Sequence, residues 1–84
     1  MKLFETHALS LASYLTYLGH ELHDVHMPKG SRTALFVFVR SRDLDADVVT
    51  FTGKEAQVEP HGYAQAYRQM KRRLYQTVDQ ARAA

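Results

Sequence analysis

The sequence predicts a small α+β protein in which a helix, a two-stranded β-hairpin, a short helix and a long C-terminal helix follow one another. Three observations lead to this fold class: apolar residues recur at helical spacing in two segments, an unbroken apolar run lies between them, and proline or glycine separates the segments. The chain has 84 residues, with no internal repeat and no linker-like stretch. We therefore expect residues 1–84 to form a single domain.

The first helix is expected over residues 7–18. Its apolar residues are spaced so that they line one side of a helix: Ala8, Leu11, Ala12, Leu15 and Leu18. Thr6 is the expected N-terminal cap, because its hydroxyl can accept a hydrogen bond from a backbone N–H of the first turn. Gly19 follows at the position where a left-handed residue commonly ends a helix.

A β-hairpin is expected next, around the turn residues MPKGSR at positions 27–32. The following segment, TALFVFVR, is apolar at both alternating positions, which indicates a strand that is covered on both faces. The strand before the turn contains Leu22 and Val25. These two residues lie three positions apart, and in a regular strand their side chains would point to opposite faces. Both can therefore face the core only if a bulge separates them or the strand begins late.

Two further helices are expected after the hairpin. The short one lies near residues 43–52, with Asp43 as the candidate cap and Gly53 as its end. Residues 54–59 form an extended link or a short third strand. Pro60 then begins the long helix, at a position where its missing N–H has no cost. The apolar stripe of the long helix is spaced by fours and threes: Tyr63, Tyr67, Met70, Leu74, Thr77, Val78 and Ala81.

Dimerisation is expected to complete this fold. A chain of this length buries roughly 60% of its unfolded surface, which is little for a self-sufficient core. A two-stranded sheet that is apolar on both faces also cannot be covered well by so few elements. We therefore expect a homodimer.

Composition excludes several classes of protein. Cysteine is absent, so no disulfide staples the chain and no thiolate acts as a nucleophile or zinc ligand. The N-terminal residues MKLFETHALS lack the unbroken apolar run of a signal peptide. The longest apolar run, residues 34–39, is far shorter than the ~20 residues of a membrane span. We therefore expect a cytoplasmic protein with no membrane contact.

The segment HELHDVH, which begins at His20, is the one stretch whose composition suggests a metal site. A zinc-protease helix needs H-E-x-x-H, and the spacing here is one residue short. In an extended strand, His20 and His26 share a face but lie ~20 Å apart, too far for one ion, while His23 points to the opposite face. We interpret the segment as a solvent-facing strand without metal. The sequence leaves open whether His7 or His61 completes a site.

Catalytic motifs are equally weak. Ser10 and Ser13 fall within the first expected helix, without the glycines of a nucleophile elbow. Gly53 and Lys54 lack the earlier glycine and the following hydroxyl residue of a phosphate-binding loop. We therefore expect a protein that is not an enzyme and has no cofactor. A His-dependent metal enzyme is the remote alternative.

The charge distribution points to the last helix. The net charge is +2, yet the residues from Pro60 onward carry five basic side chains against one acid, Asp79. At about 100° per residue, an outward arc of the helix gathers the candidate partner-binding residues, which we call the basic face: Arg68, Lys71, Arg72, Tyr75 and Arg82. Arginine is enriched at protein interfaces and pairs with carboxylates. Phosphate contacts with base stacking are the alternative, and a plain solvated surface is the third interpretation.

Several short motifs, taken in order, resemble a known family. They are F-x-T, Y-L-x-x-L-G-H-E-L, F-V-F, D-L-D, F-T-G-K-E-A-x-V and Y-x-x-A-Y-R-x-M-K-R. Over about residues 4–75 the chain resembles a family of small proteins frequent in phage and other mobile-element genomes, the domain of unknown function 5659. The resemblance implies a fold and a genomic setting, with no catalytic residue carried over. If a phage encodes the chain, we expect it in the host cytoplasm.

Together these patterns suggest a small non-enzymatic interaction protein. The first hypothesis is that the basic face binds a protein partner and modulates a host or phage macromolecular complex. The second is a nucleic-acid-binding accessory protein that uses the same face. The sequence does not identify the partner.

Overall fold

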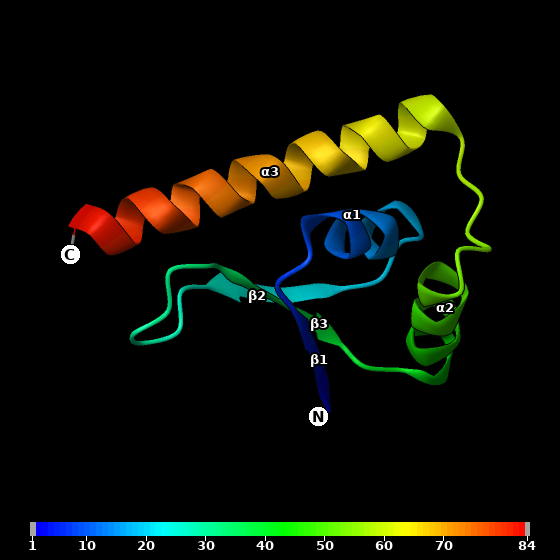
Figure 1. Ribbon diagram of the computed structural model, residues 1–84, viewed down its shortest axis with the longest axis horizontal. Helices are drawn as coiled ribbons and strands as arrows, with labels where there is room; N and C mark the ends of the chain where they lie inside the picture. The colour runs from blue at the N-terminus through cyan, green and yellow to red at the C-terminus, as the bar shows by residue number, and fades with distance from the viewer. Residues whose placement is uncertain (1, 84) are drawn as a thin grey trace.

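The computed structural model describes residues 2–83 and confirms an α+β fold with a long C-terminal helix. Its elements are β1 (Leu3–Thr6), α1 (Leu9–Tyr17), β2 (Leu22–His26), β3 (Leu35–Val39), α2 (Arg42–Thr52) and α3 (Pro60–Ala83). Figure 1 shows α1 lying between the sheet and α3, with α2 beyond the end of β3. Among residues 2–83, no helix has both the length and the apolar composition that crossing a membrane requires.

The sheet has three strands, so the expected two-stranded hairpin was incomplete. The strands are antiparallel in the order β1-β3-β2, and β3 is therefore central. The third strand comes from the N-terminus, where Leu3 pairs with Val39 and Thr6 with Phe36. The alternative third strand at residues 54–59 does not form, and this segment is a link. A strand of four residues has too short a pattern to predict, because it is defined by its pairing with β3.

A bulge in β2 confirms the prediction made from parity. The register of β2 against β3 shifts between Leu22, which pairs with Phe38, and Asp24, which pairs with the adjacent Val37. His23 is the extra residue. This insertion allows Leu22 and Val25 to face the core together, although they lie three positions apart and would point to opposite faces of a regular strand.

Helix α1 ends as predicted but begins later. Gly19 adopts a left-handed conformation with φ of 91°, and the N–H groups of Gly19 and His20 donate to the carbonyls of Thr16 and Leu15. At the other end, Thr6 is not the cap. Ala8 occupies that position, because Thr6 belongs to β1 and its hydroxyl accepts from the N–H of Ala8, before the first turn.

Helix α2 is capped by Ser41, so the prediction of Asp43 was wrong. The Ser41 hydroxyl oxygen accepts from the N–H of Leu44 at 3.1 Å, and Asp43 lies in the first turn instead. Gly53 does end the helix, but with φ of −77°. The left-handed residue is Lys54, with φ of 61°. The end of α2 therefore does not depend on the conformational freedom of glycine.

The core lies between α1 and the inner face of the sheet. Its buried members come from five elements: Leu11, Ala12, Tyr14 and Leu15 of α1, Val25 of β2, Phe36 and Phe38 of β3, Leu44 of α2 and Met70 of α3, with Ala34 beside β3. In α1, the five consecutive residues 11–15 are buried. A helix buried on every side must be covered by more than a sheet, and here α3 supplies the second cover.

The first turns of α3 are held against α1 by tyrosines. The Tyr17 hydroxyl accepts from the N–H of Glu59 at 3.0 Å, and Gly62 packs against the Tyr17 ring. The Tyr63 hydroxyl donates to the carbonyl of Ser10 at 3.0 Å. Burial, with a contribution from Tyr67, raises the pKa of the Tyr63 phenol above its ordinary value. The shift favours the protonated form, which is the form that donates to Ser10.

The outer face of the sheet has no helix against it within residues 2–83 (Figure 1). Its apolar centre is Val37 of β3, with Val39 on the same side. Leu3 lies opposite Val39 and is 40% exposed. Glu5 and Asp24 flank Val37 on the two neighbouring strands. One of the two apolar faces of β3 is thus covered by α1 and α3. On the other face Val37 is buried nonetheless, Leu35 and Val39 are half-buried, and Leu3 is the exposed apolar side chain.

Replacing Gly62 tests whether its contact with the Tyr17 ring fixes the first turns of α3 against α1. A Cβ at this position would lie 2.9 Å from Cε1 of Tyr17, a distance that carbon atoms avoid. An unhindered Gly→Ala change within a helix stabilises by about 1 kcal/mol, whereas overpacking costs about 1–3 kcal/mol. We expect Gly62→Ala to lower the free energy of unfolding measured in urea.

The matched control is the same change in a Tyr17→Ala background. There the obstructing ring is absent, so Gly62→Ala is expected to stabilise the protein. A gain in stability in the presence of Tyr17 would show that the ring moves aside without cost, and that the contact does not fix α3.

Candidate functional site

The basic face lies on the solvent side of α3, as the periodicity predicts. All five of its residues are exposed: Arg68, Lys71, Arg72, Tyr75 and Arg82. The side of the helix that faces α1 is instead built from Ala66 and Met70, which are buried. Helical periodicity therefore separates a stripe that packs from an arc that does not.

The positive charges of α3 have no carboxylate partner among residues 2–83. The ion pairs of the described chain join His20 to Asp47, His26 to Asp24, and Arg40 to Asp45, all outside α3. The closest interaction on the basic face is a cation–π contact, in which the Lys71 ammonium lies 5.9 Å from the centre of the Tyr75 ring. Five cationic side chains of α3 are thus available to an external anion: Arg73 and the four cations of the basic face, Arg68, Lys71, Arg72 and Arg82.

The C-terminal half of α3 leaves α1 and passes over the hairpin (Figure 1). The apolar stripe continues there, but Leu74 and Val78 are only half-buried. Thr77 holds the helix near β2, because its hydroxyl lies 3.4 Å from the carbonyl of Val25 and 2.8 Å from that of Arg73. This part of α3 therefore covers the hairpin incompletely.

Two hollows lie beneath this half of α3. The first, of about 450 Å³, is lined by His7, Arg32, Thr33, Ala34, Leu74, Tyr75, Val78, Asp79 and Arg82. The second, of about 380 Å³, is lined by Met27, Ser31, Arg32, Val78, Ala81 and Arg82. Three residues belong to both, namely Arg32, Val78 and Arg82, so the hollows are neighbouring parts of one depression. We call their combined lining the hairpin groove.

The groove joins residues that the sequence analysis treated separately. Tyr75 and Arg82 were predicted as partner-binding residues, and both line it. Arg32 and His7 were not predicted to belong to this surface. His7 is fixed in place because its Nδ1 lies 3.0 Å from the carbonyl of Ala34, an acceptor, and therefore carries the proton. No local sequence pattern indicates that an arginine in a turn lies near a helix that is distant along the chain. That Arg32 and α3 line the same groove is therefore seen only in the folded chain.

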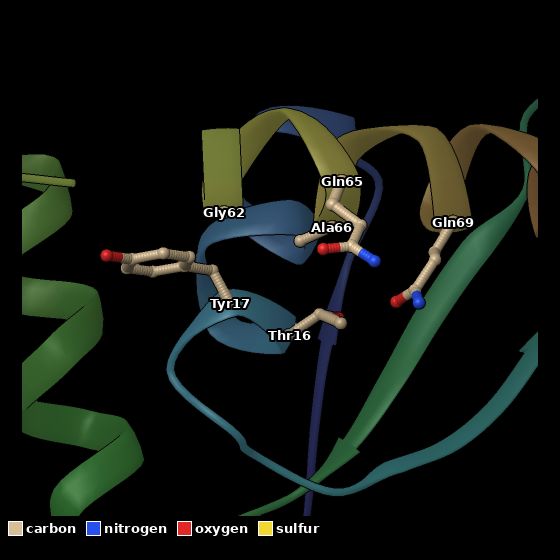
Figure 2. Close-up of a pocket in the computed structure, with 6 residues that line it drawn as sticks. All are labelled: Thr16, Tyr17, Gly62, Gln65, Ala66 and Gln69. Carbon is tan, nitrogen blue, oxygen red and sulfur yellow. The ribbon is translucent and has the colours of Figure 1, made fainter. Parts of the chain in front are cut away.

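A third hollow, of about 370 Å³, lies between α1 and the first half of α3. Figure 2 shows the side chains of Gln65 and Gln69 reaching from α3 toward Thr16, while the Tyr17 ring points away. The Thr16 hydroxyl is buried and makes no hydrogen bond to a described residue. This hollow contains no charged side chain and is separate from the basic face.

The histidine-rich segment does not gather into a metal-binding cluster among residues 2–83. His20 precedes β2, and its Nε2 lies 2.6 Å from a carboxylate oxygen of Asp47 on α2. His26 lies 3.2 Å from Asp24 on the outer face of the sheet, and His23 is exposed at the bulge. The segment thus serves at least one structural purpose, which is to tie the end of α1 to α2.

The fold and this surface define a small α+β protein with an exposed basic helix. Residues 1–76 match the family described as Domain of unknown function (DUF5659), and the chain belongs to that family. No curated protein and no solved structure matches the chain. The family match ends at Gln76, so it includes most of the basic face but not Arg82.

The contact of His20 with Asp47 can be tested against a matched histidine. Removing a partly buried hydrogen-bond partner costs about 1–3 kcal/mol, so His20→Ala is expected to destabilise the protein by that amount in urea unfolding. His23→Ala is expected to change the stability little, because His23 is exposed at the bulge.

Equal losses in the two variants would contradict the structural assignment of His20. Zinc content, measured on protein purified without a histidine tag, completes the test. We expect less than stoichiometric zinc, and a stoichiometric ion that is lost in either variant would assign a metal site to this segment.

Proposed function

We propose that this protein is a non-enzymatic interaction protein whose basic face binds an acidic protein partner. The observation that carries the proposal is that the four cations of the basic face have no carboxylate partner within residues 2–83. All of these side chains are exposed on the helix. An external anionic surface would give them the charge-assisted hydrogen bonds that the fold does not.

The surroundings of the basic face support a protein partner over a nucleic acid. The helix presents apolar side chains, Leu74 and Val78, directly beside its cations, and mixed apolar and arginine surfaces are typical of protein interfaces. The whole chain carries a net charge of only +2, whereas nucleic-acid-binding domains are commonly more basic. Tyr75 is 56% exposed, so it can serve as an aromatic anchor for a partner.

Charge reversal on α3 tests this proposal. Arg68→Glu, Lys71→Glu and Arg72→Glu together should abolish capture of the partner, because they place acids against an acidic surface. The thermal midpoint should move little, since all three side chains are exposed. The matched control reverses three exposed cations elsewhere, Lys29→Glu, Arg42→Glu and Lys54→Glu, and should leave capture intact.

The measurement is affinity capture from cell lysate, followed by the Kd of the captured partner at several salt concentrations. A protein partner is retained after nuclease treatment. A nucleic-acid partner is lost, and its affinity falls with salt at a log–log slope of about −0.9 per duplex phosphate contact. Capture that survives the α3 reversal would show that the basic face is ordinary solvated surface.

We also propose that a second copy of the chain covers the outer face of the sheet. The strand β3 is apolar on both sides, which is typical of a strand with two covered faces, and α1 and α3 cover only one of them. Leu3 on this face is 40% exposed. Packing of two such faces would bury the remaining apolar side chains of β1 and β3 in a sheet-on-sheet contact.

Light scattering tests the proposed homodimer. At tens of micromolar, we expect a mass near twice the chain mass of 9.6 kDa. Leu3→Glu should shift the mass to that of one chain. Val49→Glu is the control, because Val49 is an exposed apolar residue on α2, and this variant should remain dimeric. A monomeric unchanged protein would contradict the proposal.

A further inference from the structure

We propose that the hairpin groove binds an extended peptide in which acidic and bulky apolar residues alternate. The apolar side chains would lie against Leu74 and Val78, and the carboxylates would pair with Arg32 and Arg82. This inference rests on the proposed function, because it names the part of a protein partner that α3 recognises. It also adds a site outside the helix, since Arg32 belongs to the turn between β2 and β3.

The shape of the groove suits a chain rather than a compact ligand. Its two hollows, of about 450 and 380 Å³, each fall in the size range of a ligand site. They share Arg32, Val78 and Arg82, and therefore follow one another along the gap between α3 and the hairpin. A segment that occupies both can place one side chain in each.

The floor of the groove is apolar. Ala34 is buried there, and Leu74 and Val78 are half-buried with space beside them. In the second hollow, Met27 and Ala81 add apolar surface. Apolar side chains inserted at these places would remove water from surface that the fold leaves partly wet, which favours binding.

The rim of the groove is positive. Arg32 and Arg82 are exposed and have no carboxylate partner among residues 2–83. The guanidinium group is suited to bidentate pairing with a carboxylate. Asp79 is the one acid among the residues that line either hollow. The excess of cations therefore selects for an acidic segment, and the apolar floor selects against a nucleic acid, whose phosphates need polar partners.

The groove is continuous with the basic face through Tyr75 and Arg82, which belong to both. A peptide held in the groove would thus extend toward Lys71, whose ammonium already lies 5.9 Å from the Tyr75 ring. α3 and the turn between β2 and β3 would contact the peptide from opposite sides. Such a site explains why the C-terminal half of α3 keeps an apolar stripe that the rest of the chain covers incompletely.

Fluorescence anisotropy with short labelled peptides tests the chemistry of the groove. The first peptide alternates glutamate with leucine, the second glutamate with serine, and the third lysine with leucine. We expect the glutamate–leucine peptide to bind most tightly, because it alone satisfies both the rim and the floor. Equal binding of the glutamate–serine peptide would overturn the proposal, since the floor would then contribute nothing.

Substitution of Arg32 tests the location. Loss of one charge-assisted pair corresponds to about a ten-fold weaker Kd, so we expect at least that effect from Arg32→Gln and a larger one from Arg32→Glu. Lys29→Glu is the matched control, because Lys29 is an exposed cation of the same turn that does not line the groove. Circular dichroism and the thermal midpoint establish that each variant is folded.

Two outcomes separate this inference from the proposed function. In the first outcome, the triple α3 charge reversal abolishes binding of the glutamate–leucine peptide while both Arg32 variants bind it normally. The groove is then excluded as the binding site, and the basic face alone is the site. If the Arg32 variants weaken binding and the α3 reversal does not, the groove is supported and the wider basic face is excluded. An equal effect of Lys29→Glu and Arg32→Glu would overturn the location of the site in the groove.

Discussion

The packing of α3 on α1 is the contact on which the rest of the structure depends. Five consecutive residues of α1 are buried, which the sheet alone cannot achieve, because a helix on a sheet keeps one side in solvent. Ser13 lies within this buried stretch and satisfies its hydroxyl by donating to the carbonyl of Leu9 at 2.7 Å. α1 is therefore an interior helix, and α3 covers the side of it that faces away from the sheet. Loss of this packing would expose the core of a very small protein.

This packing explains why the two sides of α3 differ in composition. The stripe that contains Gly62, Ala66 and Met70 faces α1, and its small residues permit close approach. The opposite side is exposed to solvent. Like charges one turn apart, such as Arg68 and Arg72, destabilise an isolated helix slightly. Gathering cations there does not stabilise the helix, which supports the proposal that they bind a partner.

Much of this architecture could be predicted from the sequence because it is encoded locally. Gly19 ends α1, Pro60 begins α3, and the spacing of apolar residues places Met70 on the side of α3 that packs. Ala66, which is also buried there, lay outside the predicted stripe, and Ala81 at the end of the stripe is exposed. Even the bulge in β2 follows from the parity of two residues. β1 could not be predicted in the same way, because LFET is too short to show a period and becomes a strand only by pairing with β3. Ser41 was missed as a cap because Asp43, two residues later, offers an equally good oxygen.

The residues of the candidate site likewise differ in whether local sequence predicts them. Its helical part follows from periodicity and charge, whereas Arg32 and His7 join it only through the tertiary fold. Position 32 lies in a glycine-containing turn, where an arginine is ordinarily read as a solvated residue. The turn becomes part of a surface because β2 and β3 project it under the end of α3.

Amide hydrogen exchange along α3 tests the central claim most directly. If α3 is the outer wall of the core, amides from Tyr67 to Leu74 should exchange as slowly as those of β3, because both open only when the whole protein unfolds. Amides after Val78 should exchange much faster, through fraying of the part that overlies the hairpin. If instead the whole of α3 exchanged far faster than β3, the helix would dock only weakly, and the fold would not depend on its contact with α1.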